Sequence, residues 1–118
     1  MSRILLIEAD PAERLVLRSR IQDNGHEVVV AENGARGLVE ARAGRFDLVL
    51  LASRLGDGVD GAEVCRRLKA APQIQMVPVI VYSHEVASAQ GAERMFDAGC
   101  EQFLAKAQMP LLERVVEV

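Results

Sequence analysis

Short apolar runs alternate with longer amphipathic segments along the chain, and this alternation restricts the fold more than any other feature of the sequence. The apolar runs are typical of buried strands, and they span residues 3–8, 26–31, 47–52, 77–83 and 101–106. Helical patterns separate them, and a last one begins at residue 110. Strands that alternate with helices form a parallel sheet with right-handed crossovers and helices on both faces. The sequence therefore predicts an α/β domain with a doubly wound, five-stranded sheet.

Capping residues mark where the predicted helices begin and end. Asp10 precedes Pro11, which suits the first position of a helix, and Gly25 suits the left-handed residue that ends one. Asn33 and Asp60 precede the second and third helical patterns in the same way. Apolar residues at helical spacing support each helix. Leu17 and Ile21 share one face of the first, Leu38 and Ala41 lie on the second, and Val64, Cys65 and Leu68 are predicted to face inward on the third. A fourth helix is marked by Ala89, Ala92 and Phe96.

Length and charge limit the class of protein. The 118 residues suffice for one domain with a substantial core, and we take residues 1–118 as that domain. The net charge is −3 and no run of Lys or Arg occurs, which disfavours nucleic acid and membrane surfaces as partners. No signal peptide or spanning segment is apparent, and Cys65 and Cys100 lie outside any CxxC motif. We therefore expect reduced core thiols in a cytoplasmic protein.

The ends of the predicted strands hold the candidate functional residues. In such sheets ligands bind beyond the carboxyl ends of the strands, where the strand order reverses. With the order 2-1-3-4-5, the first and third strands flank that point. The residues delivered there are Glu8, Ala9 and Asp10 after the first strand, Ala52 after the third, Ser83 after the fourth and Lys106 after the fifth. We expect Lys106 to pair with Glu8 across this crevice.

Six stretches, taken in order, resemble the receiver domains of bacterial two-component response regulators. They are IEADPAER (7–14), HEVVVAENG (26–34), FDLVLL (46–51), DGAEVCRRLK (60–69), VPVIVYS (77–83) and DAGCEQFLAK (97–106). The likeness covers nearly the whole chain. It implies a flavodoxin-like (βα)5 fold with sheet order 2-1-3-4-5. It also implies a role in phosphorelay signalling, as the amino-terminal part of a longer protein.

The resemblance assigns roles to the residues at the strand ends, and two of them depart from the family pattern. In that family an aspartate at the end of strand three accepts a phosphoryl group from a histidine kinase. Two acids after strand one help it to hold Mg²⁺, a Ser or Thr ends strand four, and a Lys ends strand five. Carried over, the first acid is Glu8, the serine is Ser83 and the lysine is Lys106. The second acid position is Ala9, and the phosphoacceptor position is Ala52.

The chemistry of phosphate acceptance depends on what position 52 offers. A methyl group is no nucleophile, and Mg²⁺ requires several oxygen ligands. We therefore expect Mg²⁺ binding to be lost or weak, with no cofactor and no enzymatic activity. Asp10 is better explained as a helix cap than as a metal ligand. The sequence predicts a pseudo-receiver, a signalling module that binds proteins and is not phosphorylated at the usual site.

Three alternatives stay open. Asp57 or Asp60, in the loop after the third strand, would serve as a displaced phosphoacceptor, although Asp60 also suits a helix cap. The second alternative is that the crevice binds a small ligand. GDGVDG (56–61) matches the GxGxxG dinucleotide fingerprint. The acid that would bind the ribose about twenty residues later is missing. The third is a laboratory Asp→Ala change at Ala52. The other departures, Ala9 and Ala107, argue against it, because one substitution would leave them untouched.

The resemblance also implies where a protein partner binds. Receivers usually signal through the face built by helix four, strand five and helix five. The candidate contact residues on that face are Val86, Gln90, Arg94, Gln102, Phe103 and Met109. Phe103 matches the aromatic switch position of the family, and packing into the core explains an aromatic residue there equally well.

Overall fold

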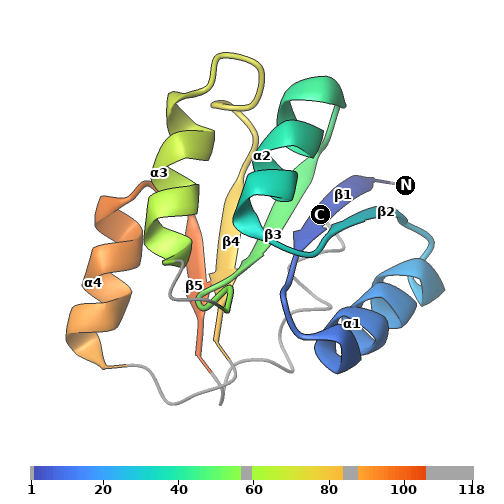
Figure 1. The fold of residues 1–118 in the computed structure, drawn as a ribbon, viewed down its shortest axis with the longest axis horizontal. Helices are drawn as coiled ribbons and strands as arrows, with labels where there is room; N and C mark the ends of the chain where they lie inside the picture. Colours follow the sequence, from blue (N-terminus) through green and yellow to red (C-terminus); the bar gives the residue numbers. More distant parts are fainter. Residues whose placement is uncertain (1, 57–59, 84–87, 106–118) are drawn as a thin grey trace.

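The computed structural model describes residues 2–56, 60–83 and 88–105, which fold around one five-stranded parallel sheet (Figure 1). The strands are β1 (Arg3–Ile7), β2 (Glu27–Ala31), β3 (Leu48–Ala52), β4 (Val79–Tyr82) and β5 (Gln102–Leu104). Their order is β2-β1-β3-β4-β5. The predicted flavodoxin-like sheet is confirmed, with β3 at its centre and β2 at one edge.

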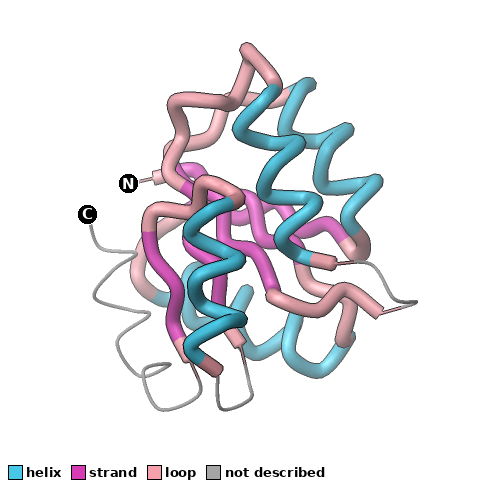
Figure 2. Tube along the Cα trace, turned by 90° about the vertical axis from the view of Figure 1, so that its left-hand side faces the viewer, coloured by secondary structure: helices cyan, strands magenta, loops and turns pink. Residues whose placement is uncertain are grey.

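Helices lie on both faces of this sheet. They are α1 (Pro11–Asp23), α2 (Gly34–Ala43), α3 (Gly61–Ala70) and α4 (Ala89–Asp97). The crossover from β1 to β2 runs across the sheet in the opposite direction to the later crossovers. Right-handed connections therefore place α1 on one face and α2, α3 and α4 on the other (Figures 1 and 2). Within the described residues no helix is long and apolar enough to cross a membrane, and the helix predicted from residue 110 lies outside them.

Side-chain caps begin the helices where the sequence predicts them. Asp10 Oδ1 accepts hydrogen bonds from the Ala12 and Glu13 N–H groups, at 2.9 and 3.4 Å. Asn33 caps α2 and Asp60 caps α3 in the same manner. These caps fix the points at which the chain turns back from the carboxyl edge of the sheet.

The apolar residues that mark the first three helices lie in the core, whereas those that mark the fourth are mostly outside it. The inward residues of the first three are buried: Leu17, Ile21, Leu38, Ala41, Val64, Cys65 and Leu68. In α4 the buried residue is Met95, while Ala89 is exposed and Phe96 is 50% exposed. The predicted fourth helix is present, and Ala89 and Phe96, two of the residues that mark it, lie outside its buried stripe. Because α4 packs beside the edge strand β5, only a narrow stripe of it is covered, and Phe96 falls outside that stripe.

The two cysteines lie in the core as free thiols. Burial raises the pKa of Cys65 to about 11 and the pKa of Cys100 to about 12. A thiol is nucleophilic only as the thiolate. Both side chains therefore act at neutral pH as small apolar groups.

Gly61, the first residue of α3, lies directly against the end of β3. Its N–H donates to the Ser53 carbonyl at 3.1 Å. A Cβ at position 61 would lie 2.7 Å from the Ala52 oxygen and 2.8 Å from the Ser53 oxygen. These are backbone atoms, which cannot rotate away as a side chain can.

We expect Gly61→Ala to lower the free energy of unfolding by roughly 1–3 kcal/mol, measured by urea denaturation.

The matched control is Gly91→Ala in α4. A Cβ there meets only the Ser88 hydroxyl oxygen, at 3.2 Å, and alanine favours a helix over glycine by up to about 1 kcal/mol. We expect stability to be unchanged or slightly higher. Equal losses in the two variants would contradict the close approach at Gly61.

Candidate functional site at the carboxyl edge of the sheet

Three neighbouring strands end side by side at the carboxyl edge of the sheet. Ile7 is the register partner of Leu51, and Ala52 is that of Tyr82. Glu8 follows Ile7, so Glu8, Ala52 and Tyr82 occupy equivalent positions on β1, β3 and β4. Side chains alternate between the two faces along a strand, and register partners share a face. These three side chains therefore form one row.

A hydrogen bond joins the two outer members of this row. Tyr82 Oη donates to Glu8 Oε1 at 2.9 Å, although β3 runs between β1 and β4. Two inter-strand steps separate those strands by about 10 Å, so the bond passes over the side chain of Ala52. Tyr82 is fully buried, and Glu8 and Ala52 are 3% and 4% exposed. A methyl group leaves this path open, whereas a carboxylate at position 52 would compete with the tyrosine for the same space.

The second oxygen of the Glu8 carboxylate is engaged as well. Oε2 accepts the Asp10 N–H at 3.2 Å, where the chain leaves β1 for α1. Arg14 holds the same turn by donating from Nη1 to the carbonyl oxygens of Glu8 and Ala9, each at 3.1 Å. The first acid of the predicted pair thus acts as a buried hydrogen-bond acceptor, and Asp10 acts as the predicted cap.

Tyr82 is a site residue that the sequence analysis missed. Burial raises the pKa of Tyr82 far above its ordinary value, and the charge of the Glu8 carboxylate raises it further. The hydroxyl therefore stays protonated and serves as a donor. Since a buried carboxylate is costly without donors, Tyr82 supplies what Glu8 needs. A signal was present, because Tyr82 is the only tyrosine and directly precedes Ser83, but its contact with β1 follows only from the register.

A small cleft opens beside this row. Its volume is about 200 Å³, below the ~300–1,000 Å³ of typical small-molecule pockets. Its lining residues are Glu8, Asp10, Glu13, Ala52, Ser53, Arg54, Tyr82 and Ser83. Four predicted site residues are therefore brought together, whereas Ala9 is not part of the lining. Lys106 lies outside the described residues, so its pairing with Glu8 stays a prediction.

The loop after β3 carries the two acids considered as displaced phosphoacceptors. Asp60 Oδ1 accepts the Ala62 N–H at 2.9 Å, and Oδ2 accepts Arg94 Nη2 at 2.6 Å. Both of its oxygens are therefore occupied, by the helix cap and by an ion pair with α4. Asp57 lies outside the described residues.

The candidate residues of the predicted partner face differ in their surroundings. Arg94 lies on the side of α4 that faces α3, where Asp60 holds it. Gln90 and Gln102 are exposed, and Phe103 is half-buried against the core. The remaining two candidates, Val86 and Met109, lie outside the described residues.

Phe96 is a large apolar side chain of α4 that the structure leaves exposed. It follows Arg94 by two positions, which is about 200° around a helix, so it lies on the flank of α4 away from α3. Its ring is 50% exposed. Exposed aromatic rings are among the side chains that protein interfaces favour.

Known protein families include one to which this chain belongs. The family model described as the response regulator receiver domain matches residues 4–116. The chain belongs to this family, whose members act in two-component signal transduction and contact other proteins such as kinases and effectors.

The chain is similar to parts of longer regulators. It is 37% identical over 108 residues to the KDP operon transcriptional regulatory protein KdpE of Escherichia coli, covering 90% of this chain and 45% of that protein. It is 31% identical over 107 residues to a gliding motility regulatory protein of Myxococcus xanthus, covering 91% of this chain and 14% of that protein. The chain thus spans less than half of each. The solved structure of Vibrio cholerae CheY4 shares the fold, with a TM-score of 0.87, 23% identity, and coverage of 98% of this chain and 96% of that one.

The hydrogen bond over Ala52 can be tested through the ionisation of Tyr82. The chain has one tyrosine and no tryptophan, so ultraviolet absorbance of tyrosinate reports this residue alone. Because folding raises the pKa of Tyr82, ionisation favours the unfolded chain. Its contribution to stability is full below the unfolded pKa of about 10 and is lost as the pH rises above it. We expect tyrosinate to appear only together with loss of the helical circular dichroism signal.

Two further measurements complete this test. In denaturant the same absorbance change should have its midpoint near pH 10. Tyr82→Phe keeps the ring but removes the donor, so we expect a loss of roughly 1–3 kcal/mol in the free energy of unfolding. That loss should shrink when Glu8→Gln is already present. A native chain whose tyrosine ionises near pH 10 with its helices intact would show that the bond to Glu8 is absent.

Proposed function

We propose that this receiver domain is a pseudo-receiver, a protein-interaction module that is not phosphorylated at the usual position. The observation that carries the proposal is the hydrogen bond between Tyr82 and Glu8, which passes over the methyl group of Ala52. Where the family places a nucleophilic carboxylate, this chain has a methyl group beneath a tyrosine. A methyl group cannot be activated to attack phosphorus.

The surrounding acids support the same conclusion. Of the two acids considered as displaced acceptors, Asp60 lies within the described residues, and its oxygens accept hydrogen bonds from the Ala62 N–H and from Arg94. An acid that is bound in this way is a poor nucleophile, because attack would cost both the cap and the ion pair.

The donor set also fits Mg²⁺ poorly. The ion prefers near-octahedral oxygen ligands, usually from more than one carboxylate. Here Glu8 is bound by Tyr82 and by the Asp10 N–H, and the other two family positions are Ala9 and Ala52. Within the described residues no group of three or more His, Cys, Asp or Glu side chains is placed to hold a metal ion. We propose that the domain works without Mg²⁺.

The partner surface in this proposal is the exposed flank of α4 together with β5. Phe96 supplies an exposed ring, and Gln90 and Gln102 supply exposed polar groups. Arg94 is paired with Asp60 at the start of α3, and its side chain is still 59% exposed. With no phosphoryl group to bias two states, the domain presents one surface permanently.

Phosphorylation is tested with a small phosphodonor. Incubation with acetyl phosphate and Mg²⁺ should leave the intact mass unchanged, because position 52 offers no nucleophile. A receiver domain with an aspartate at the acceptor position serves as the positive control. A stable phosphoryl adduct on Asp57 or Asp60 would overturn the proposal in favour of a displaced acceptor.

Restoring the acids of the family pattern tests the same proposal from the opposite direction. Ala52→Asp alone should stay unphosphorylated and lose stability, because the new carboxylate meets Tyr82 and stands beside Glu8. Combining it with Ala9→Asp and Tyr82→Val restores the second acid and clears the space, so we expect Mg²⁺-dependent phosphorylation to return in the triple variant. Rapid phosphorylation of the single variant would show that Tyr82 does not block the site.

The partner surface is tested in the parent protein. Phe96→Ser and Gln102→Lys should impair its function in cells while the domain stays folded by circular dichroism. Val39→Ser is the matched control, since Val39 is 53% exposed, close to the 50% of Phe96, but lies on α2. Ser83→Ala in the cleft should have little effect. The opposite pattern, a disabling Ser83→Ala with silent changes on α4 and β5, would indicate a small ligand in the cleft.

A further inference from the structure

The free edge of β2 offers backbone groups for pairing. The Glu27 N–H donates to the Ser2 carbonyl at 2.9 Å, and the Ala31 carbonyl accepts the Glu8 N–H at 3.0 Å. These residues of β2 therefore face β1. Because backbone groups alternate in direction along a strand, the N–H and C=O groups of Val28 and Val30 point away from the sheet. Within the described residues β2 pairs only with β1.

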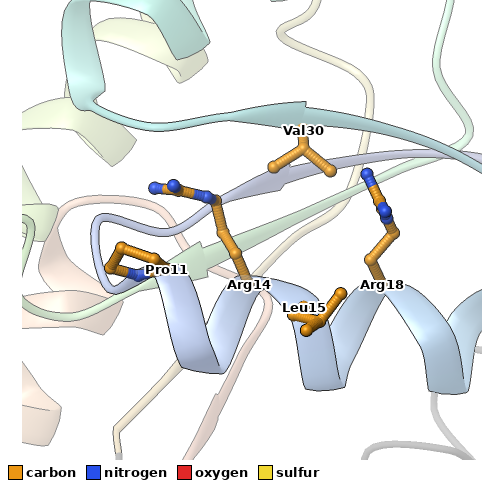
Figure 3. A pocket seen from close by; sticks show the side chains of 5 residues that line it. All are labelled: Pro11, Arg14, Leu15, Arg18 and Val30. Carbon is orange, nitrogen blue, oxygen red and sulfur yellow. The ribbon is translucent and has the colours of Figure 1, made fainter.

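A stripe of α1 borders this edge. Pro11, Arg14, Leu15 and Arg18 follow helical spacing and line a shallow hollow with Val30 of β2. In Figure 3 Arg14 and Arg18 rise from the helix on either side of Leu15, toward the strand that carries Val30. Leu15 is 58% exposed. The hollow thus has an apolar floor between two guanidinium groups.

The charge around Val30 is mainly positive. The position of Arg14 is fixed by its bonds to the turn after β1, and Arg18 has no ion pair in the described part of the chain. A second hollow adjoins the first and is lined by Arg14, Val30, Glu32 and Arg36. Arg36 is paired with Glu40 at 2.7 Å. Among the residues that line the two hollows, Glu32 is the single acid.

We propose that β2 accepts an acidic segment of a partner protein, bound in extended conformation as an additional strand. The backbone groups of Val28 and Val30 would pair with the segment, as in other complexes formed by strand addition. Its carboxylates would bind Arg14 and Arg18, for which planar bidentate pairing is favourable. Apolar side chains of the segment would cover Leu15. This surface is separate from α4 and β5, so the proposal goes beyond the interaction module described above.

Charge complementarity favours an acidic partner over a second copy of this chain. Two copies paired through β2 about a twofold axis would bring their α1 helices to the same face. The arginines of one stripe would then approach those of the other, and like charges placed close together are destabilising. An acidic strand meets no such opposition. An unpaired apolar edge strand is in any case a template for pairing.

The test uses a fluorescent peptide, blocked at both ends, with the repeat Glu-Ser-Val-Ser, which places glutamate and valine in turn on one face of an extended strand. It is added to the chain at low salt. We expect saturable binding that weakens with salt, and backbone amide shifts in the nuclear magnetic resonance spectrum at Val28 and Val30. Val28→Pro removes an outward N–H without removing a bond to β1. Arg18→Glu reverses one charge of the stripe. We expect each variant to weaken binding by about tenfold or more.

Arg20→Glu is the matched control. Arg20 is exposed on α1 two positions beyond Arg18, on the side of the helix away from the stripe, and its replacement should leave binding within about twofold. Circular dichroism verifies that each variant is folded, and Arg18→Glu keeps the test decisive if Val28→Pro unfolds the domain.

Four results would overturn the proposal. The first is the absence of saturable binding, and the second is equal binding of the same peptide with lysine in place of glutamate. Displacement by millimolar inorganic phosphate with no effect of Val28→Pro would indicate a small-anion site. A dimer that Val28→Pro dissociates would indicate that a second copy occupies the edge.

Discussion

The register of a parallel sheet that is covered on both faces determines what this domain can do. Each strand must be apolar along its length, because helices bury the sheet from both sides. Polar side chains can stand only where the strands end. The pairing of Ile7 with Leu51 and of Ala52 with Tyr82 then decides which strand ends meet. Shifting β4 by one residue would turn Tyr82 to the other face and leave Glu8 without its donor.

The site is stabilised mainly because both oxygens of the buried Glu8 carboxylate accept hydrogen bonds. A hydrogen bond to a charged group contributes about 1.5–3 kcal/mol net, and an unsatisfied buried carboxylate costs at least as much. Tyr82 and the Asp10 N–H each serve one oxygen of that carboxylate. The carboxyl edge is thus held together by local polar contacts, in which Glu8 accepts hydrogen bonds from Tyr82 and from the Asp10 N–H.

The sequence predicted the elements well because their signals are local. Asp10, Asn33 and Asp60 act on the next turn of chain, so their capping roles can be read without the fold. The strand order and the position of Ala52 followed from the resemblance as much as from the pattern. The buried face of α4 was harder to predict. Apolar residues lie on both sides of its buried stripe, and only packing distinguishes the buried Met95 from the exposed Phe96.

The contacts of Tyr82 and Arg94 could not be predicted, because their partners are distant in sequence. Tyr82 contacts Glu8 across an intervening strand, 74 positions away. Arg94 reaches Asp60 from a different helix, 34 positions away. Both contacts depend on the relative placement of elements, which no pattern within either segment encodes.

The bond over Ala52 has an evolutionary consequence. The ring of Tyr82 reaches Glu8 across the strand that carries Ala52, so a longer side chain at position 52 has to share that space. We therefore expect the residues at positions 52 and 82 to covary: a small residue at one position should accompany a large residue at the other.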